Sequence, residues 1–138
     1  MKKETILPKA EWHLFDAKST TLGRMSTEIA SLLLGKHLTG SAKHTVAPVR
    51  VVVINAESLV VTGKKKEQKM YRKYSGYPGG LRERTMNEQM ERDCTFVIRQ
   101  SVSGMLPKNN LRDDRLHNLY IYPGAEHPHM AQINTPAL

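Results

Sequence analysis

Apolar positions divide the first part of the chain into a strand, a helix and a second strand. Residues 12–16 form a short aromatic and aliphatic run that ends at a polar turn, which favours a strand. From Thr21 the apolar residues recur at helical spacing, and this pattern predicts an amphipathic helix that ends near Gly35. Residues 51–54 are a continuous β-branched run, which is typical of a strand covered on both faces at the centre of a parallel sheet.

The second part of the chain continues this alternation. Thr85 and Glu88 have the spacing of a capping box, so a short helix is expected to begin there. Residues 96–105 have helical spacing, and their helix must end before Pro107. Residues 119–122 predict a last strand. This order of elements indicates the α/β class, with three α/β/α layers and a mostly parallel sheet of about four strands.

A strongly basic segment, residues 64–84, lies between the two parts. It carries eight Lys and Arg against two Glu, and Tyr71, Tyr74 and Tyr77 are set among the cations. Its glycines and its proline predict an irregular tip. We therefore expect the chain to leave the core here as a basic loop.

The composition favours a polyanionic partner. The 138 residues include 21 Lys and Arg against 13 Asp and Glu, which gives a formal net charge of +8. Nucleic acid is the commonest polyanion for a small basic protein, because each cation placed on a phosphate releases condensed counterions. No apolar run approaches the roughly 18 residues that span a bilayer, and the N-terminus shows no secretory signal, so a cytoplasmic location is expected.

Cys94 is the only cysteine in the chain. A single thiol excludes an internal disulfide and a multi-cysteine zinc site, and it is consistent with a reducing compartment. We expect Cys94 to be a small buried packing residue.

The chain is expected to form one domain with two appendages. Residues 1–11 lack periodicity and carry mixed charge, which predicts an extended N-terminal arm. Residues 12–122 form the expected α/β domain, which includes the basic loop at 64–84. Residues 123–138 are expected to end the chain as an irregular C-terminal tail.

Several short motifs follow one another in a recognisable order. They are Trp12 with Asp16 and Ala17, Leu22-Gly23-Arg24, Gly35-Lys36-His37, Val53-Ile54-Asn55-Ala56, Thr62-Gly63-Lys64, the run from Tyr71 to Gly80, Gly104-Met105-Leu106-Pro107-Lys108, and His127-Pro128-His129-Met130-Ala131-Gln132. Over about residues 12–132 they resemble large-subunit ribosomal protein thirteen of bacteria. The resemblance implies an α/β/α domain that binds large-subunit ribosomal RNA, joins the particle early in assembly and contacts neighbouring large-subunit proteins.

Two places depart from the pattern of that family. The family usually has Gly-Asp before the valine strand, where this chain has Val49-Arg50. It usually has Leu-Gly-Arg where this chain has Leu111-Arg112-Asp113. Because the added acidic residues lower the local positive potential, residues 111–115 are the least favoured as an RNA contact.

Cations, stacking rings and imidazoles define the candidate RNA contacts. Lysines neutralise phosphates, arginines fork onto phosphate or stack on bases, and tyrosines stack on unpaired bases. Imidazoles also donate hydrogen bonds to phosphate and stack on bases. The candidate RNA-binding residues are Lys36, His37, Lys64, Lys65, Lys66, Lys69, Arg72, Lys73, Tyr74, Tyr77, Arg82, Arg84, Lys108, His127, His129 and Gln132.

Each of these interpretations has a plainer alternative. The basic segment is otherwise a solvated loop whose tyrosines pack inward. Lys36 is otherwise a cation at a helix end, where it interacts with the negative end of the helix dipole. The histidine tail is otherwise a segment packed against the domain. All three alternatives stay open at the level of sequence.

Patterns for catalysis or for a metal are weak. Lys64 follows Gly63 as in half of a phosphate loop, but the full Gly-rich spacing is absent. His127 and His129 have no third ligand fixed nearby in sequence, and no catalytic triad or carboxylate pair has a familiar spacing. We therefore expect a non-enzyme without a metal, cofactor, membrane or small-molecule partner. The alternatives are a free-standing RNA-binding regulator and a metal- or nucleotide-dependent α/β enzyme.

Overall fold

The computed structural model describes residues 10–39 and 42–133. The predicted N-terminal arm therefore lies almost entirely outside the described residues, and Glu11 belongs to the first strand. In chain order the elements are β1 (Glu11–Asp16), α1 (Leu22–Leu33), β2 (Val49–Ile54), the 3-10 turn η1 (Ala56–Ser58), α2 (Lys65–Gln68), β3 (Met70–Tyr74), β4 (Leu81–Thr85), α3 (Met86–Arg92), α4 (Cys94–Met105), α5 (Leu111–His117), β5 (Leu119–Ile121) and α6 (Met130–Ile133).

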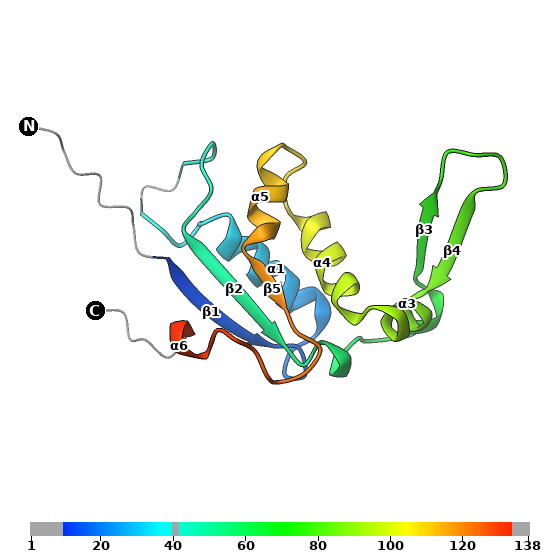
Figure 1. Ribbon diagram of the computed structural model, residues 1–138, viewed down its shortest axis with the longest axis horizontal. Helices are drawn as coiled ribbons and strands as arrows, with labels where there is room; N and C mark the ends of the chain where they lie inside the picture. Colours follow the sequence, from blue (N-terminus) through cyan, green and yellow to red (C-terminus); the bar gives the residue numbers. More distant parts are fainter. Residues whose placement is uncertain (1–9, 40–41, 134–138) are drawn as a thin grey trace, which may run out of the picture.

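A parallel sheet with the order β1-β2-β5 forms the centre of the molecule (Figure 1). The β-branched strand β2 is central, as the sequence predicts, and the α/β class is confirmed. The sheet has three strands where about four were expected. The expected strand around Val60 is reduced to an isolated parallel bridge with Thr21.

The hydrophobic core lies between one face of this sheet and helices α1 and α4. Val49, Val51 and Val53 alternate along β2, are almost fully buried and belong to this core. Cys94, at the start of α4, is a free buried thiol in the same core, and its expected packing role is confirmed. The sheet and these two helices thus form the rigid part of the molecule.

Among the described residues, the opposite face of the sheet is covered by the C-terminal segment of the chain and not by long helices. Val52 points to this side and is fully buried, although it lies outside the main core. The C-terminal segment crosses this face, and its short helix α6 lies beside β1 (Figure 1). The tail is therefore not wholly irregular, and a single helical turn supplies the second outer layer.

The ends of the helices follow the sequence signals closely. Gly35 has a positive φ of 70°, and its N–H donates to Leu32 O at 2.8 Å while the Lys36 N–H donates to Ser31 O at 3.2 Å. These bonds form a Schellman motif, which confirms that α1 ends near Gly35. The capping box of Thr85 and Glu88 is present at the start of α3, and α4 ends before Pro107 as predicted.

The basic segment is more regular than the predicted loop. It contains the helical turn α2 and an antiparallel hairpin of β3 and β4, which projects away from the rest of the molecule (Figure 1). Only residues 75–80 form the irregular tip. Charged residues occur on both strand faces, so the apolar alternation that normally reveals a strand is missing.

Helix α5 was not predicted at all. Its first turn carries Asp113 and Asp114, which stabilise a helix N-terminus, and its Arg115 is 2% exposed. No helix in the described part of the chain has the length and apolar character needed to cross a membrane.

Candidate nucleic-acid interface

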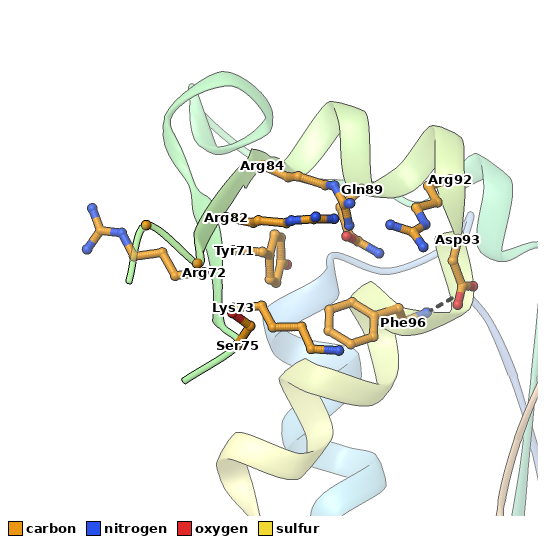
Figure 2. Close-up of a pocket in the computed structure, with 12 residues that line it drawn as sticks. Tyr71, Arg72, Lys73, Ser75, Arg82, Arg84, Gln89, Arg92, Asp93 and Phe96 are labelled. Atoms are coloured by element: carbon orange, nitrogen blue, oxygen red, sulfur yellow. Dashed lines mark hydrogen bonds between the residues drawn. The ribbon is translucent and has the colours of Figure 1, made fainter. Parts of the chain in front are cut away.

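The hairpin presents two chemically different faces. Residues directly opposite each other in an antiparallel ladder point to the same side, and successive residues point to alternate sides. Tyr71 is paired with Arg84 and Lys73 with Arg82, so these four side chains share one face. This face is turned toward helices α3 and α4 (Figure 2).

An open groove of about 530 Å³ lies between that face and the two helices. The side chains of Arg82 and Arg84 come from β4 and extend over it, and Arg92 approaches from α3 (Figure 2). The groove residues are Tyr71, Arg72, Lys73, Ser75, Gly79, Gly80, Arg82, Arg84, Gln89, Arg92, Asp93 and Phe96.

Aromatic rings form one wall of the groove. Tyr71 and Phe96 meet edge to face, with their ring centroids 5.9 Å apart and their planes at 72°. Lys69 Nζ lies 5.4 Å from the centre of the Tyr71 ring, within cation–π range. Burial raises the pKa of Tyr71, so its hydroxyl is a hydrogen-bond donor at neutral pH. Within the described residues that hydroxyl has no hydrogen-bond partner.

Positive charge dominates the groove. Asp93 is the one acidic side chain among its described lining residues, and its carboxylate caps α4. It accepts from Thr95 Oγ1 at 2.7 Å, from Thr95 N at 3.0 Å and from Phe96 N at 3.3 Å, the last drawn in Figure 2. The hydrogen bond from the Thr95 side chain is the main cause that lowers the Asp93 pKa.

The groove arginines are free to meet an external anion. Arg82, Arg84 and Arg92 make no ion pair with any residue in the ranges that the structure describes. Arg72 differs, because its guanidinium points away from the groove (Figure 2) and pairs with Glu83 across the outer face of the hairpin. The four predicted cations of the hairpin therefore differ in their environment. Arg72 is paired on the outer face, whereas Lys73, Arg82 and Arg84 lie on the groove face, unpaired with any described residue.

Tyrosines and apolar side chains are exposed on the rest of the hairpin. Tyr74 and Tyr77, both predicted RNA contacts, are 63% and 75% exposed. Tyr74 shares the outer face with Met70 and Leu81, which are also exposed. The alternative in which all the tyrosines pack inward applies only to Tyr71, which is half-buried against Phe96.

The lysines before the hairpin lie beside a second groove. Lys65 and Lys69 line this groove of about 660 Å³ together with Arg24, at the start of α1. Lys64 and Lys66 are exposed next to them at the beginning of α2. Lys69 also contacts Tyr71, so the two basic grooves adjoin at the base of the hairpin.

Lys36 and Lys108 mark another basic region, at the end of α1 and the turn between α4 and α5. Lys36 lines a pocket of about 500 Å³ with Lys43 and Pro107, and Lys108 is exposed in the turn that follows Pro107. The buried Arg115 donates to Lys43 O at 3.3 Å and so holds the neighbouring loop. Arg115 is thus a structural arginine.

The histidines of the tail are held against the sheet. The His129 ring lies 4.9 Å from the Trp12 ring and 4.7 Å from the Tyr120 ring, and its Nε2 is 3.0 Å from Tyr122 Oη. His127 Nδ1 accepts from the His129 N–H at 3.3 Å. This packing favours the plainer alternative for His129, whereas Gln132 is exposed on α6 and open to a partner.

The structure gathers the predicted RNA contacts into separate regions. The hairpin and α2 hold most of them, the end of α1 and the turn after α4 hold a second group, and the tail holds the third. Arg92, Phe96 and Gln89 line the main groove but were not predicted. Gln89 and Arg92 lie three residues apart on one side of α3, whereas Phe96 belongs to α4 and joins them only through the packing of the two helices.

The fold and the grooves define a small α/β protein that presents unpaired cations beside aromatic rings on a projecting hairpin. This architecture suits binding to a polyanion by charge and shape. Comparison with known proteins gives the family: the model of "Ribosomal protein L13" matches residues 10–128. The chain belongs to this ribosomal protein family, a structural family that is not enzymatic, so the prediction of a non-enzyme is confirmed and the enzyme alternative was wrong.

Curated relatives are similar over most of their length. The chain is 48% identical over 122 residues to large ribosomal subunit protein uL13 of Clostridioides difficile, covering 88% of this chain and 85% of that protein. It is 44% identical over 126 residues to that of Rubrobacter xylanophilus, covering 91% and 88%. It is 45% identical over 134 residues to that of Prochlorococcus marinus, covering 94% of both. The resemblance inferred from short motifs is therefore confirmed.

Proposed function

We propose that this chain is a structural component of the large ribosomal subunit in the cytoplasm and that it binds large-subunit ribosomal RNA. We further propose that it contacts neighbouring large-subunit proteins and supports an early stage of subunit assembly. The names of the relatives refer to the large ribosomal subunit, which supports the proposed location of this chain. The groove between the hairpin and helices α3 and α4 is the observation that carries the RNA-binding part.

The groove suits RNA because it combines two kinds of recognition. The guanidinium groups of Arg82, Arg84 and Arg92 suit bidentate hydrogen bonds to phosphate oxygens, and the capped helices α3 and α4 form the wall opposite the hairpin. The wall of Tyr71 and Phe96 offers a surface on which an unpaired base stacks. Helix α4 packs into the hydrophobic core, which keeps the side of the groove that carries Phe96 preorganised, so less entropy is lost on binding.

Matched arginine variants test which face of the hairpin binds RNA. Arg82→Gln and Arg72→Gln remove the same charge from the same hairpin, but only Arg82 is unpaired and faces the groove. In binding titrations with large-subunit ribosomal RNA, Arg82→Gln should weaken binding and lower the salt slope by about 0.7–0.9 for the lost phosphate contact. Arg72→Gln should change the slope less. An equal change in the salt slope for both variants would show that the groove does not contact the RNA.

A sedimentation experiment tests the ribosomal setting itself. The tagged chain should co-sediment with large subunits through a high-salt wash, because many contacts in an assembled particle act together. A chain with Lys73, Arg82 and Arg84 all changed to Gln should be depleted from those particles and enriched in the free pool. A free-standing RNA-binding regulator would instead stay off the large subunit in both forms. Such an outcome would exclude the proposed structural role.

A further inference from the structure

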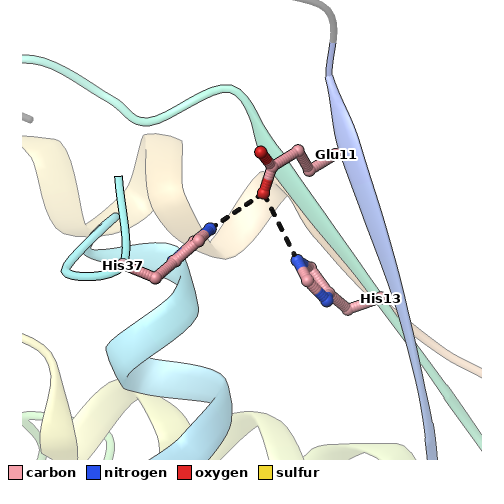
Figure 3. Close-up of polar contacts among 3 residues, drawn as sticks. All are labelled: Glu11, His13 and His37. Atoms are coloured by element: carbon pink, nitrogen blue, oxygen red, sulfur yellow. Dashed lines mark hydrogen bonds and ion pairs between the residues drawn. The ribbon is translucent and has the colours of Figure 1, made fainter. Parts of the chain in front are cut away.

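Three potential metal ligands converge at the edge of the sheet, far from the hairpin. Glu11 and His13 are two residues apart on β1, so their side chains lie on the same side of the strand. His37 follows the end of α1 and points toward them (Figure 3). His37 Nε2 lies 2.9 Å from Glu11 Oε2, and His13 Nε2 lies 3.7 Å from the same oxygen.

The backbone on both sides of this cluster is well fixed. The Glu11 N–H donates to Pro48 O at 2.9 Å, which ties the start of β1 to the approach to β2. On the other side, the Schellman motif at Gly35 ends α1, and the Leu38 N–H donates to Gly35 O at 3.0 Å. The three ligands therefore belong to ordered segments that tertiary structure brings together.

His13 Nε2 is the unusual atom in the cluster. It is buried and has no hydrogen-bond partner among the described residues, although it faces the Glu11 carboxylate. The rings of His13 and His37 meet at 87° with their centroids 5.7 Å apart, so they converge on the carboxylate from different directions. A buried ring nitrogen without a partner is costly, and a bound ligand would satisfy it.

The distances fit the ligand shell of a small metal ion. Two nitrogen or oxygen ligands of a tetrahedral Zn²⁺, each about 2.0–2.1 Å from the metal, are roughly 3.3 Å apart. The three potential ligand atoms in the cluster all lie within 4.8 Å of one another, and the two distances to Glu11 Oε2 are close to that separation. Side-chain rotations that draw the three ligand atoms closer together would close the shell.

We propose that Glu11, His13 and His37 bind one Zn²⁺ ion, with a water molecule as the fourth ligand. Two imidazoles and one carboxylate are a ligand set that suits zinc, and Ca²⁺ and Mg²⁺ prefer oxygen ligands alone. All three side chains are partly exposed, which leaves access for the ion and its water. The ion clamps the start of β1 to the loop after α1.

Zinc titration of single variants tests the site. Full-length protein is dialysed against a chelator and titrated with Zn²⁺ in competition with a chromophoric chelator. The wild type should bind one equivalent, and His13→Asn should lose at least tenfold in affinity. His13 is the informative position, because its removal leaves the hydrogen bond between His37 and Glu11 in place. His44→Asn, an exposed histidine outside the cluster, should bind zinc like the wild type.

A second measurement keeps the test valid if a variant folds poorly. Substoichiometric Zn²⁺ added to the wild type should shift the imidazole NMR signals of His13 and His37 and leave that of His44 in place. Co²⁺ in place of Zn²⁺ should give the intense visible absorption of a four-coordinate site. Zinc affinity that is unchanged by both His13→Asn and His37→Asn, or imidazole signals that do not respond to zinc, would overturn the proposal.

Discussion

Asn55 shows how one side chain fixes the join between two strands. It is the one non-glycine residue with a positive φ, 58°, among those described, and it follows the last residue of β2. Its Nδ2 donates to Asp16 Oδ1 at 2.9 Å, which links the ends of β1 and β2. Asparagine tolerates the left-handed conformation better than most residues, so its backbone and its side chain both suit this position.

Two substitutions of Asn55 separate these contributions. Asn55→Gly keeps the left-handed backbone but loses the hydrogen bond, and should cost about 1 kcal/mol in the free energy of unfolding. Asn55→Ala also forces an alanine into that conformation, and should cost a further 1 kcal/mol or so. Urea denaturation measures both values. Equal values for the two variants would show that the backbone conformation contributes nothing.

The lowered pKa of Asp93 predicts a stability that depends on pH. The hydrogen bond from Thr95 and the N–H groups of α4 favour the charged carboxylate, so the folded-state pKa lies below the ordinary value of 3.8. The contribution of the charged Asp93 carboxylate to the free energy of unfolding is therefore complete above that value. It is lost as the pH falls through the folded-state pKa. Urea midpoints measured from about pH 6 down to about pH 2 should fall in the wild type.

Variants at the same position supply the control for that pH dependence. Asp93→Asn still caps α4 but does not titrate, so its urea midpoint should fall less at low pH than that of the wild type. Asp93→Ala loses the cap as well, and should cost about 1 kcal/mol at neutral pH. A wild-type acid profile that Asp93→Asn reproduces in full would assign the effect to other carboxyl groups.

At the scale of elements, the hairpin depends on a small contact with the helices. Tyr71 at its base meets Phe96 of α4 edge to face, a contact worth about 0.5–1.5 kcal/mol. Tyr71 only packs against the edge of the hydrophobic core, and no residue of β3 or β4 is among the fully buried core residues. The hairpin and the core are therefore expected to differ in local stability.

Phe96→Ala should loosen the hairpin and leave the sheet unchanged. Amide hydrogen exchange in β3 and β4 should become about tenfold faster, as expected for a loss near 1.4 kcal/mol. Exchange in β2 should change far less. Phe96 is 38% exposed, so its removal leaves no large cavity in the core. Faster exchange throughout the sheet would show that the hairpin and the core unfold as one unit.

Elements with their own local signals were predictable from the sequence. The capping box at Thr85, the glycine at 35 and the β-branched strand β2 all carry information within a few residues. The hairpin strands lack such signals, since charged residues occupy both of their faces. Helix α5 offers only the acidic pair Asp113 and Asp114 in its first turn, and its Arg115 is buried through tertiary contacts. Sequence patterns report local preference, and these elements depend on their neighbours.

The difference between local signals and tertiary contacts also explains which parts of the candidate sites could be predicted from the sequence. The cations of the basic segment could be predicted because charge accumulates along the chain. The pairing of Arg72 with Glu83 could not, because it depends on strand register. Glu11 and His37 are far apart in sequence and meet only because β1 lies next to the end of α1. Ligand spacing rules consider near neighbours, so they miss a cluster of this kind.

At the scale of the whole molecule, the hydrophobic core and the hairpin that we propose to bind RNA occupy different parts of the chain. The core lies between the sheet and helices α1 and α4, whereas the hairpin projects beyond them (Figure 1). A chain whose hairpin is shortened should therefore fold normally. The ladder register shows where to cut: the Ser75 N–H donates to Gly80 O, and hydrogen-bonded pairs alternate, so Tyr71 and Arg84 form such a pair.

Replacement of residues 72–83 by Asn-Gly, a two-residue type I′ turn, uses this register. The variant keeps the contact between Tyr71 and Phe96 and removes two groove cations, Lys73 and Arg82. Its urea midpoint should stay close to that of the wild type, while its salt slope for RNA binding should fall by about 1.4–1.8. An unfolded variant would show that folding depends on the removed part of the hairpin. An unchanged salt slope for RNA binding would show that the RNA binds another face of the protein.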